Sequence, residues 1–301
     1  MSNSLRVLVT GGSGFIGLDL VKGLLNKNYN VCSIDIHPIK FSHPNLIHRS
    51  VDLLNGSEIK KILKEYNPDY VFHLAAFNSN PESFKNSKFC FDLNFNGTLN
   101  LFDELRNFPV KKIFLPSSYY LSIQQSQEYF DSPYTLSKNF QEQLARHYSK
   151  FFSLPVTIFR LANVFGKTGS KETLVGSLIQ KIINRDSTIQ LGELNIKRDF
   201  IFLDDVVSAL LALISTQEII PELIEIGTGQ GILLKDLVNI VKDEAHYQGS
   251  ITSQSSISAS NMTPSLIADP SFLTNSLHWK PQYSLREGLR LIITSERESI
   301  K

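Results

Sequence analysis

The sequence is poor in the residues that build covalent or metal-bound frameworks. Its 301 residues include two cysteines, Cys32 and Cys90, and both lie in apolar stretches. A disulfide framework or a cysteine-based metal site needs more thiols than these. The seven histidines are scattered, and the local group of His37, His43 and His48 lies in a proline-broken segment. We therefore expect buried free thiols and no metal site.

Long apolar runs and an excess of charge are also lacking. The chain has no apolar run of about 18 residues, as a membrane span requires, and no charged-then-apolar leader. The formal net charge is +1, so no strong field favours nucleic acid or a membrane surface as a partner. A hydrophobic content of 42% and a charged content of 20% are typical of a globular protein. We expect a cytoplasmic protein that acts on small molecules in a reducing compartment.

The first half of the chain alternates between strand-like and helix-like patterns. Short β-branched runs are separated by segments in which apolar residues recur three and four positions apart. This alternation predicts an α/β fold with a Rossmann-type doubly wound parallel sheet, covered by helices on both faces. The predicted strands lie within residues 5–10, 29–35, 46–53, 68–76, 110–118 and 154–166.

A glycine-rich loop follows the first predicted strand and opens the first predicted helix. The spacing within VTGGSGFIG is G-x-x-G-x-x-G. Glycines permit the tight turn and the close approach of a pyrophosphate, which faces the N–H groups at the helix start. Asp35 ends the second strand, where its carboxylate accepts from both ribose hydroxyls and repels a 2′-phosphate, so NAD is favoured over NADP. The predicted dinucleotide contacts here are Gly11, Gly14, Phe15, Ile16, Gly17 and Asp35.

The regular alternation of predicted strands and helices ends after residue 166. Helical and strand patterns continue through 171–184, 198–214 and 222–230, and the Ser-rich stretch 246–264 is predicted to be a flexible loop. These segments predict a smaller C-terminal α/β substrate lobe. We expect a dinucleotide-binding domain formed by 1–166 with 199–232, and a substrate-binding lobe formed by 167–198 with 233–301.

A phenol and an ammonium, those of Tyr134 and Lys138, are four residues apart in a predicted helix and so share one face. For a tyrosine to act as a base near pH 7, its phenolate must be favoured by about 4 kcal/mol. An ammonium at about 5 Å supplies roughly 3 kcal/mol at an effective dielectric of about 20. Ser117 and Ser118 end the fifth predicted strand at the sheet edge where ligands bind, so a serine hydroxyl is available to steady a substrate oxygen.

The order and spacing of several motifs resemble the extended short-chain dehydrogenase/reductase family, the NAD-dependent epimerases and dehydratases of nucleotide sugars. The motifs are VTGGSGFIG, VDL at 51–53, VFHLAA at 71–76, NFNGTLNL at 94–101, PYTLSKNFQEQL, FRLANVFG, RDFIFLDDVV, GTGQGILLKDLV and LHWKPQYSLREGL. The resemblance implies a catalytic trio of Ser118, Tyr134 and Lys138, of which Tyr134 and Lys138 also contact the cofactor. The further cofactor contacts that it implies are Asp52, Leu53, Leu74, Ala75, Ala76 and Asn94. The implied substrate contacts are Asn78, Ser118, Asn163 and Arg198, the last gripping a diphosphate.

The chain departs from the family pattern at three places. Tyr119 and Tyr120 follow Ser118 where the dehydratases carry Asp-Glu, which argues against a 4,6-dehydratase. The segment between Ser118 and Tyr134 is shorter than usual. The family usually has a second diphosphate-binding arginine before the position of Asp269, whereas the Ser-rich stretch here contains none. A substrate with one phosphate, or none, therefore stays open.

The leading hypothesis is an NAD-dependent nucleotide-sugar epimerase that acts at C4 through a transient 4-keto sugar. The alternatives are an NAD(P)H-dependent reductase of a 4-keto-6-deoxy nucleotide sugar and a non-catalytic NAD-binding protein on the same fold. The resemblance also implies a homodimer, in which helices at 88–107 and 134–151 pair between subunits. Burial of both faces of these helices within one chain is the competing interpretation.

Overall fold

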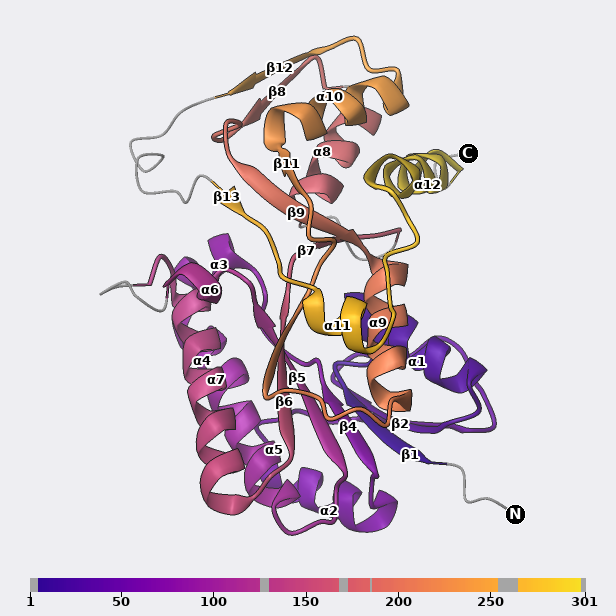
Figure 1. Ribbon diagram of the computed structural model, residues 1–301, viewed down its shortest axis with the longest axis vertical. Helices are drawn as coiled ribbons and strands as arrows, with labels where there is room; N and C mark the ends of the chain where they lie inside the picture. The colour runs from indigo at the N-terminus through magenta and orange to yellow at the C-terminus, as the bar shows by residue number, and fades with distance from the viewer. Residues whose placement is uncertain (1–4, 125–129, 168–172, 185, 254–264, 299–301) are drawn as a thin grey trace. The chain divides into compact units, whose positions relative to one another are not determined.

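The computed structural model describes residues 5–124, 130–167, 173–184, 186–253 and 265–298. The chain divides into two compact units (Figure 1). The first unit is formed by residues 1–160 with 210–224, and the second by residues 161–209 with 225–301. No helix in the described ranges is both long enough and apolar enough to cross a membrane.

A seven-stranded sheet forms the centre of the first unit, with the strand order β10-β6-β5-β4-β1-β2-β3. The pairs from β5 through β4, β1 and β2 to β3 are parallel, as helical connections between successive strands require. The order reverses between β1 and β4, so a crevice for a ligand is expected beyond the carboxyl ends of these two strands. The strands are β1 (Arg6–Thr10), β2 (Asn30–Asp35), β3 (Leu46–Ser50), β4 (Tyr70–His73), β5 (Lys112–Ser118), β6 (Val156–Leu161) and β10 (Leu223–Ile226).

Two helices of the first unit, α2 (Gly56–Tyr66) and α7 (Pro133–Phe152), begin where side chains satisfy free N–H groups. Asn55 caps α2 by accepting from the N–H of Glu58, and Ser132 and Thr135 form a reciprocal capping box at the start of α7. In place of the helix predicted at 88–107, the structure has a helical run that contains a π-helical turn, η1 (Asp92–Asn96). The helices are α1 (Phe15–Asn26), α2 (Gly56–Tyr66), α3 (Asn80–Lys85), α4 (Ser87–Phe91), η1 (Asp92–Asn96), α5 (Gly97–Leu105), α6 (Leu121–Gln124) and α7 (Pro133–Phe152).

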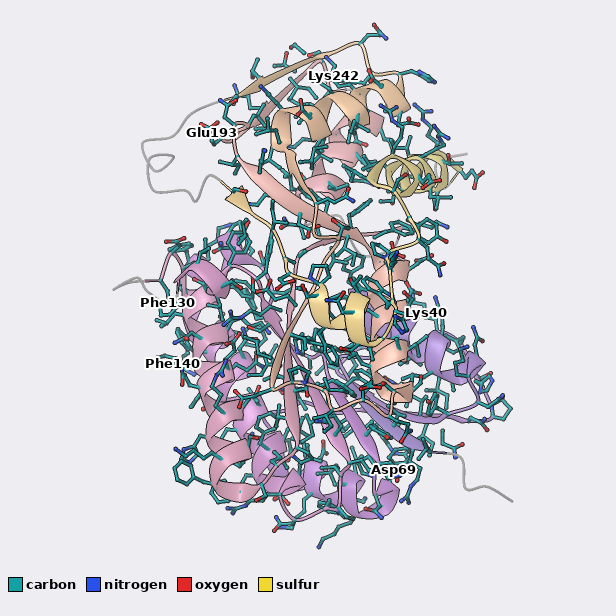
Figure 2. The ribbon with its side chains drawn as sticks, viewed as in Figure 1. Lys40, Asp69, Phe130, Phe140, Glu193 and Lys242 are labelled. Carbon is teal, nitrogen blue, oxygen red and sulfur yellow. The ribbon has the colours of Figure 1, made fainter. Side chains whose placement is uncertain are left out.

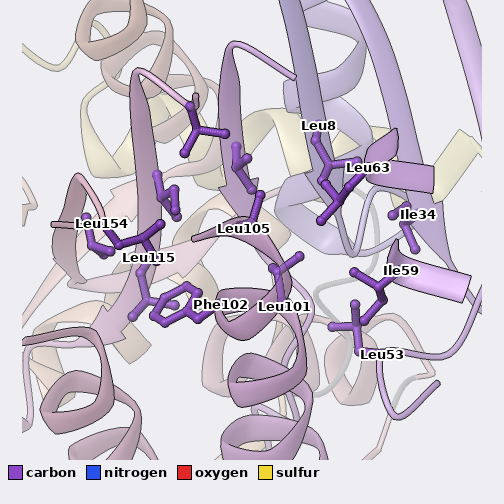
Figure 3. Packing of buried hydrophobic residues seen from close by; sticks show 14 of the residues in the cluster. Leu8, Ile34, Leu53, Ile59, Leu63, Leu101, Phe102, Leu105, Leu115 and Leu154 are labelled. Carbon is purple, nitrogen blue, oxygen red and sulfur yellow. The ribbon is translucent and has the colours of Figure 1, made fainter. Parts of the chain in front are cut away.

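The main core of the first unit lies between one face of the sheet and helices α2, α5 and α7 (Figure 3). Alternate strand residues such as Leu8 and Leu115 point to this face, because side chains along a strand alternate between its two sides. They meet Ile59 of α2 and Phe102 of α5, all fully buried. Helix α1 packs against β1 and β2 and covers the opposite face (Figure 1). The predicted α/β class and doubly wound parallel sheet are therefore confirmed.

The second unit is built around β9, which pairs with β7, β11 and β13. Its core is apolar: Phe165 packs edge-on against Phe202, and Leu237 and Ile292 are fully buried beside them. The strands are β7 (Asn163–Phe165), β8 (Thr188–Leu191), β9 (Lys197–Phe202), β11 (Gly231–Leu233), β12 (Ser250–Ser253) and β13 (Ser265–Leu266). The helices are α8 (Leu174–Ile183), α9 (Leu203–Ser215), α10 (Leu234–Ala245), α11 (Ser271–Ser276) and α12 (Leu285–Glu298), and α9 continues into the first unit.

The prediction of a flexible loop at 246–264 is wrong for its first part. Residues Ser250–Ser253 form β12, which pairs in parallel with β8 and places Ile251 opposite Ile189. Ile251 packs on the core of the second unit, so one apolar residue and a neighbouring strand decide the structure of a polar segment. Residues 254–264 lie outside the described ranges. The strand predicted at 68–76 is also shorter, because the chain leaves the sheet after His73.

Candidate active site

The glycine loop between β1 and α1 is packed too closely for side chains. Gly11 has a φ of +70°, and a Cβ there would lie 2.6 Å from the Ala75 nitrogen. A Cβ on Gly17 would lie 2.0 Å from the Gly11 carbonyl oxygen. Gly14 is the N-cap of α1, and its N–H donates to the Gly11 oxygen at 3.0 Å. Phe15 begins the first turn, whose N–H groups have no partner within the helix and point towards the loop.

Asp35 lies half-buried at the carboxyl end of β2, where it is fixed against the glycine loop. One carboxylate oxygen accepts from the Ser13 N–H at 3.0 Å, and the other accepts from the His37 N–H at 2.9 Å. Each carboxylate oxygen retains a further lone pair, which suits hydroxyl donors such as those of a ribose. The sequence prediction missed Ser13, whose hydroxyl also donates to the His37 carbonyl at 2.7 Å.

The residues after β4 lie directly beside this loop. The Leu74 N–H donates to the Thr10 carbonyl at 3.0 Å, and the Ala75 N–H donates to the Thr10 hydroxyl at 3.2 Å. Both residues and Ala76 are partly exposed at the edge of the sheet. The structure thus brings Leu74 and Ala75 against the loop that contains Gly11.

The remaining implied contacts of the first unit have different environments. Asp52 is exposed and accepts from the Leu54 N–H at 2.9 Å, whereas the Leu53 side chain is buried in the core. Asn78 is exposed in the segment before α3. The Leu53 side chain therefore faces the core, and the Leu53 carbonyl accepts from the Asn100 amide at 3.0 Å.

Asn94 is fully buried in the π-helical turn η1, a kind of turn that is frequent at functional sites. Its side-chain oxygen accepts from the Phe77 N–H at 2.7 Å. Its amide group donates to the Phe77 carbonyl at 3.0 Å and to the Ser137 hydroxyl at 2.8 Å. Asn94 thus ties the segment that follows β4 to helix α7.

Ser118 and Tyr134 are hydrogen-bonded to each other although they are 16 positions apart in the sequence. Ser118 ends β5, Tyr134 lies in the first turn of α7, and the serine hydroxyl hydrogen-bonds to the phenol. Burial raises the pKa of Tyr134, with smaller increases from Cys90 and Tyr120, while the bond with Ser118 lowers it. The hydroxyl of Ser117 is buried and has no hydrogen-bond partner among the described residues. Of the two serines, Ser118 is the one placed against the tyrosine.

The ammonium of Lys138 is almost fully enclosed, with 3% of the residue exposed. It donates to the Pro116 carbonyl at 3.1 Å and to the Gln141 side-chain oxygen at 2.9 Å. Burial lowers the pKa of Lys138 to about 8, and electrostatic interactions with Cys90 and Glu142 oppose this decrease. A lysine with a pKa of about 8 remains mostly protonated at pH 7, so a positive charge is held beside the end of β5.

Asn163 and Arg198 belong to the second unit, whereas every other predicted site residue belongs to the first. The Asn163 amide donates to the Asp199 carbonyl at 3.1 Å, and the Arg198 guanidinium donates to the Lys197 carbonyl at 2.7 Å. The sequence prediction missed the buried Asp199, whose carboxylate accepts from the Gly229 N–H at 3.0 Å and fixes a glycine turn. The signal for it was an acid directly before the apolar run of β9, residues 200–202.

The geometry of the first unit fits a bound dinucleotide. The loop at Gly11 and Gly17 can pack tightly on itself and on Ala75 only because both positions lack a Cβ, and a tight glycine turn of this kind is typical of dinucleotide-binding loops. The start of α1 offers N–H donors to phosphates, and Asp35 offers acceptors to a ribose. Ser118 lies at the carboxyl end of β5, and Tyr134 and Lys138 on helix α7 contact this end through Ser118 and Pro116.

Comparisons with known proteins give the same assignment. The model of the NAD dependent epimerase/dehydratase family matches residues 7–227. The UDP-glucuronate 4-epimerase of Thermodesulfobacterium geofontis is 26% identical over 98% of this chain and 97% of its own length. The GDP-6-deoxy-D-talose 4-dehydrogenase of Aggregatibacter actinomycetemcomitans is 29% identical over 91% of both chains. The crystal structure of the UDP-glucose 4-epimerase of Thermotoga maritima with UDP-glucose has a TM-score of 0.87 and 25% identity, and the match covers 99% of this chain and 100% of that one.

The family match covers more than two thirds of the chain and confirms the resemblance seen in the sequence. It also includes both halves of the candidate site in the first unit, from the glycine loop to Tyr134 and Lys138. This chain is a member of the NAD-dependent epimerase/dehydratase family, an enzyme with NAD as its cofactor.

Proposed function

We propose that this enzyme is a nucleotide-sugar 4-epimerase that acts through a transient 4-keto sugar. The observation that carries the proposal is the meeting of Ser118 with Tyr134 beside the buried Lys138. The similarity to two 4-epimerases of UDP-sugars supports a nucleotide sugar as the substrate. Tyr119 and Tyr120, in place of an acidic pair, speak against a dehydratase.

Tyr134 removes the proton from the sugar hydroxyl in this scheme. The Ser118 hydroxyl, hydrogen-bonded to the phenol, holds the reacting oxygen in reach of it. Burial raises the pKa of Tyr134, so the phenolate needs positive charge nearby. An ammonium at about 5 Å contributes roughly 3 kcal/mol at an effective dielectric of about 20. Among the described residues, the ammonium donates to Pro116 and Gln141, so the scheme requires it to act on Tyr134 through space.

When bound, NAD would supply the redox chemistry of the reaction, which is reversible hydride transfer at the sugar carbon. The glycine loop and Asp35 would hold its adenosine diphosphate, and Lys138 and Tyr134 would hold the end that reacts. Lys138 has three N–H groups, of which Pro116 and Gln141 take two, so the third is available to a ribose hydroxyl.

The proposal predicts that Tyr134→Phe abolishes turnover and leaves NAD binding nearly intact. General acid–base groups contribute about a hundredfold to ten-thousandfold to rate, so kcat should fall by at least about a hundredfold. Turnover is measured by separating the two epimers of a UDP-sugar, and NAD affinity by calorimetry. Full activity in this variant would refute the assignment of Tyr134, and a large fall in NAD affinity would show that the phenol hydroxyl is needed to bind the cofactor.

The second candidate is a reductase of a 4-keto-6-deoxy nucleotide sugar, favoured by the similarity to the GDP-6-deoxy-D-talose 4-dehydrogenase. The same three side chains serve both reactions. Cofactor retention separates them, because an epimerase regenerates its NAD in each cycle and keeps it through purification, whereas a reductase releases it at every turnover. Membership of an enzyme family argues against the non-catalytic alternative.

We assign substrate binding to Asn78 in the first unit and to Asn163 and Arg198 in the second unit. Arg198 offers a guanidinium suited to phosphate oxygens, and Asn163 offers an amide. The stretch where a second arginine is usual lies largely outside the described residues and contains no arginine in its sequence. A panel of sugars that carry a nucleoside diphosphate, one phosphate or none tests how much phosphate this enzyme requires.

A homodimer is a further part of the proposal. Phe140, on the outer side of α7, is 43% exposed (Figure 2) and contacts the rings of Phe91 and Phe95. A surface hollow of about 480 Å³ is lined by Phe95, Phe140 and Leu144. Sedimentation should therefore give twice the chain mass, and Phe140→Asp should reduce it to one chain. Phe151→Asp, at another exposed phenylalanine of α7, is the matched control.

A further inference from the structure

A chain of buried polar side chains runs from Lys138 across the interior of the first unit. The Lys138 ammonium donates to the side-chain oxygen of Gln141 at 2.9 Å, and the Gln141 amide nitrogen donates to the Thr98 hydroxyl at 2.7 Å. The same hydroxyl lies 2.9 Å from Nε2 of His73, whose Nδ1 lies 2.7 Å from the Thr10 hydroxyl. All five side chains are buried and come from β1, β4, α5 and α7.

The Thr98 hydroxyl can donate its proton to only one of its neighbours in this hydrogen-bonded series. The hydroxyl donates to the Asn94 carbonyl at 2.6 Å, a distance too short for two oxygens with no hydrogen between them. Its two lone pairs then accept from its two remaining neighbours, the Gln141 amide nitrogen and Nε2 of His73. Gln141 must therefore present its nitrogen to Thr98 and its oxygen to Lys138.

The tautomer of His73 follows from the same assignment of donors and acceptors. Burial lowers the pKa of His73 to about 3, so the ring is neutral and carries one N–H. Because Nε2 donates to Thr98, Nδ1 is the acceptor, and the Thr10 hydroxyl donates to it. The Thr10 oxygen in turn accepts from the Ala75 N–H at 3.2 Å, beside the glycine loop. Each hydrogen bond from Lys138 to Thr10 therefore has one assigned donor and one assigned acceptor.

We propose that Gln141 is a positioning residue for Lys138, and that Thr98 and His73 lock the Gln141 amide with its oxygen towards the ammonium. A flipped amide would place two N–H donors against a positive charge and would leave Thr98 without one of its donors. The lock keeps Lys138 charged and in place. This inference deepens the proposed role of Lys138 and rests on it only where turnover is concerned.

The charged and titratable groups that face Lys138 come from three elements. Glu142 and Tyr134 share helix α7 with it, Cys90 lies on α4, and His73 lies on β4. Glu142 is already paired with Arg160, at 2.9 Å and 2.8 Å. Cys90, a buried thiol with a raised pKa, is neutral near pH 7. Gln141 is therefore the nearest group that supports the ammonium without adding a charge.

The first test concerns the tautomer and needs no activity. In protein labelled with 15N-histidine, the ring shifts of His73 should show a proton on Nε2 and a bare Nδ1 across neutral pH. A His73→Gln variant, in which that signal is missing, identifies it. A proton on Nδ1, or a doubly protonated ring, would overturn the assigned direction of the chain.

The second test measures the proton affinity of Lys138 from its 15Nζ shift in lysine-labelled protein. Gln141→Leu keeps the volume and removes the acceptor, so the titration should move to lower pH by about one to two units, the size of a hydrogen bond to a charged group. Thr98→Val removes the locking hydroxyl and should move it in the same direction. Thr98→Ser keeps the hydroxyl and should restore the wild-type titration.

The third test is the pH profile of kcat for the same variants. In Gln141→Leu and Thr98→Val the alkaline limb should move down with the Lys138 titration, while it stays in place in Thr98→Ser. An unmoved Lys138 titration in Gln141→Leu overturns the inference, whether or not Thr98→Val folds. If the titration moves but no nucleotide sugar is turned over by the wild type, the proposed function fails and the positioning role stands.

Discussion

Lys138 should make the stability of the fold depend on pH in a way that one substitution removes. Burial lowers the pKa of Lys138 to about 8 in the folded chain, whereas an exposed lysine has a pKa near 10.4. Between these values the unfolded chain holds a proton that the folded chain has released. The free energy of unfolding therefore rises with pH by about 1.4 kcal/mol per unit in this window.

Lys138→Met removes this contribution. Integrated from pH 7 to pH 10, the stability of the wild type should rise by about 2.5 kcal/mol relative to the variant. The variant lacks the bonds that the ammonium makes to Pro116 and Gln141 at every pH. Their loss shifts the free energy of unfolding of the variant by a constant amount, and the change of the difference with pH is unaffected. The variant is expected to be inactive, since the charge that supports the phenolate is gone.

The assay is urea unfolding of NAD-free protein at pH 7, 8, 9 and 10, followed by one spectroscopic probe for wild type and variant. Lys64→Met, on the exposed side of α2, controls for the loss of a surface lysine. A difference between wild type and Lys138→Met that stays level across this range would refute the reasoning. A difference that falls would mean that the folded chain binds the proton more tightly than the unfolded one.

Two further predictions concern the glycine loop and the ion pair behind the site. Gly17→Ala places a Cβ 2.0 Å from the Gly11 oxygen, so NAD affinity measured by calorimetry should fall by about tenfold or more. Gly192→Ala, where a Cβ meets nothing, should leave that affinity unchanged, and equal affinities in both variants would contradict the packing argument. Arg160→Met leaves the buried carboxylate of Glu142 with the longer contact to Arg146, at 3.4 Å, and should cost about 3 kcal/mol in urea unfolding. Adding Glu142→Leu should recover most of that loss, and no recovery would show that the ion pair is not the cause.

The fold was predictable because local sequence patterns indicate most of its strands and helices. Each central strand is a short β-branched run, and the helices between them force a parallel sheet. Strand β12 escaped prediction because Ser250–Ser253 has one apolar residue, Ile251, and takes its structure from pairing with β8. A segment of that kind has no periodicity of its own to detect.

The candidate site was predictable to the extent that its members are neighbours in sequence. The spacing of the glycines and the separation of Tyr134 from Lys138 fix their relation within one loop and one helix. The contact of Ser118 with Tyr134 was expected from resemblance alone, because it joins two elements. The support of Lys138 by Gln141 was not predicted, since its lock depends on side chains from three other elements; His73, a lone polar residue in an apolar strand, was the available hint.

The π-helical turn at Asp92–Asn96 has a consequence for the whole first unit. Such a turn holds one residue more than an α-helical turn, so the helix after it is rotated by about 100° relative to the helix before it. Cys90, upstream, therefore looks towards Ser137 on α7, whereas Leu101, downstream, looks into the sheet. Deleting a single residue there would rotate the apolar face of α5 away from the sheet. The length of this short turn is therefore as strictly constrained as any side chain around it.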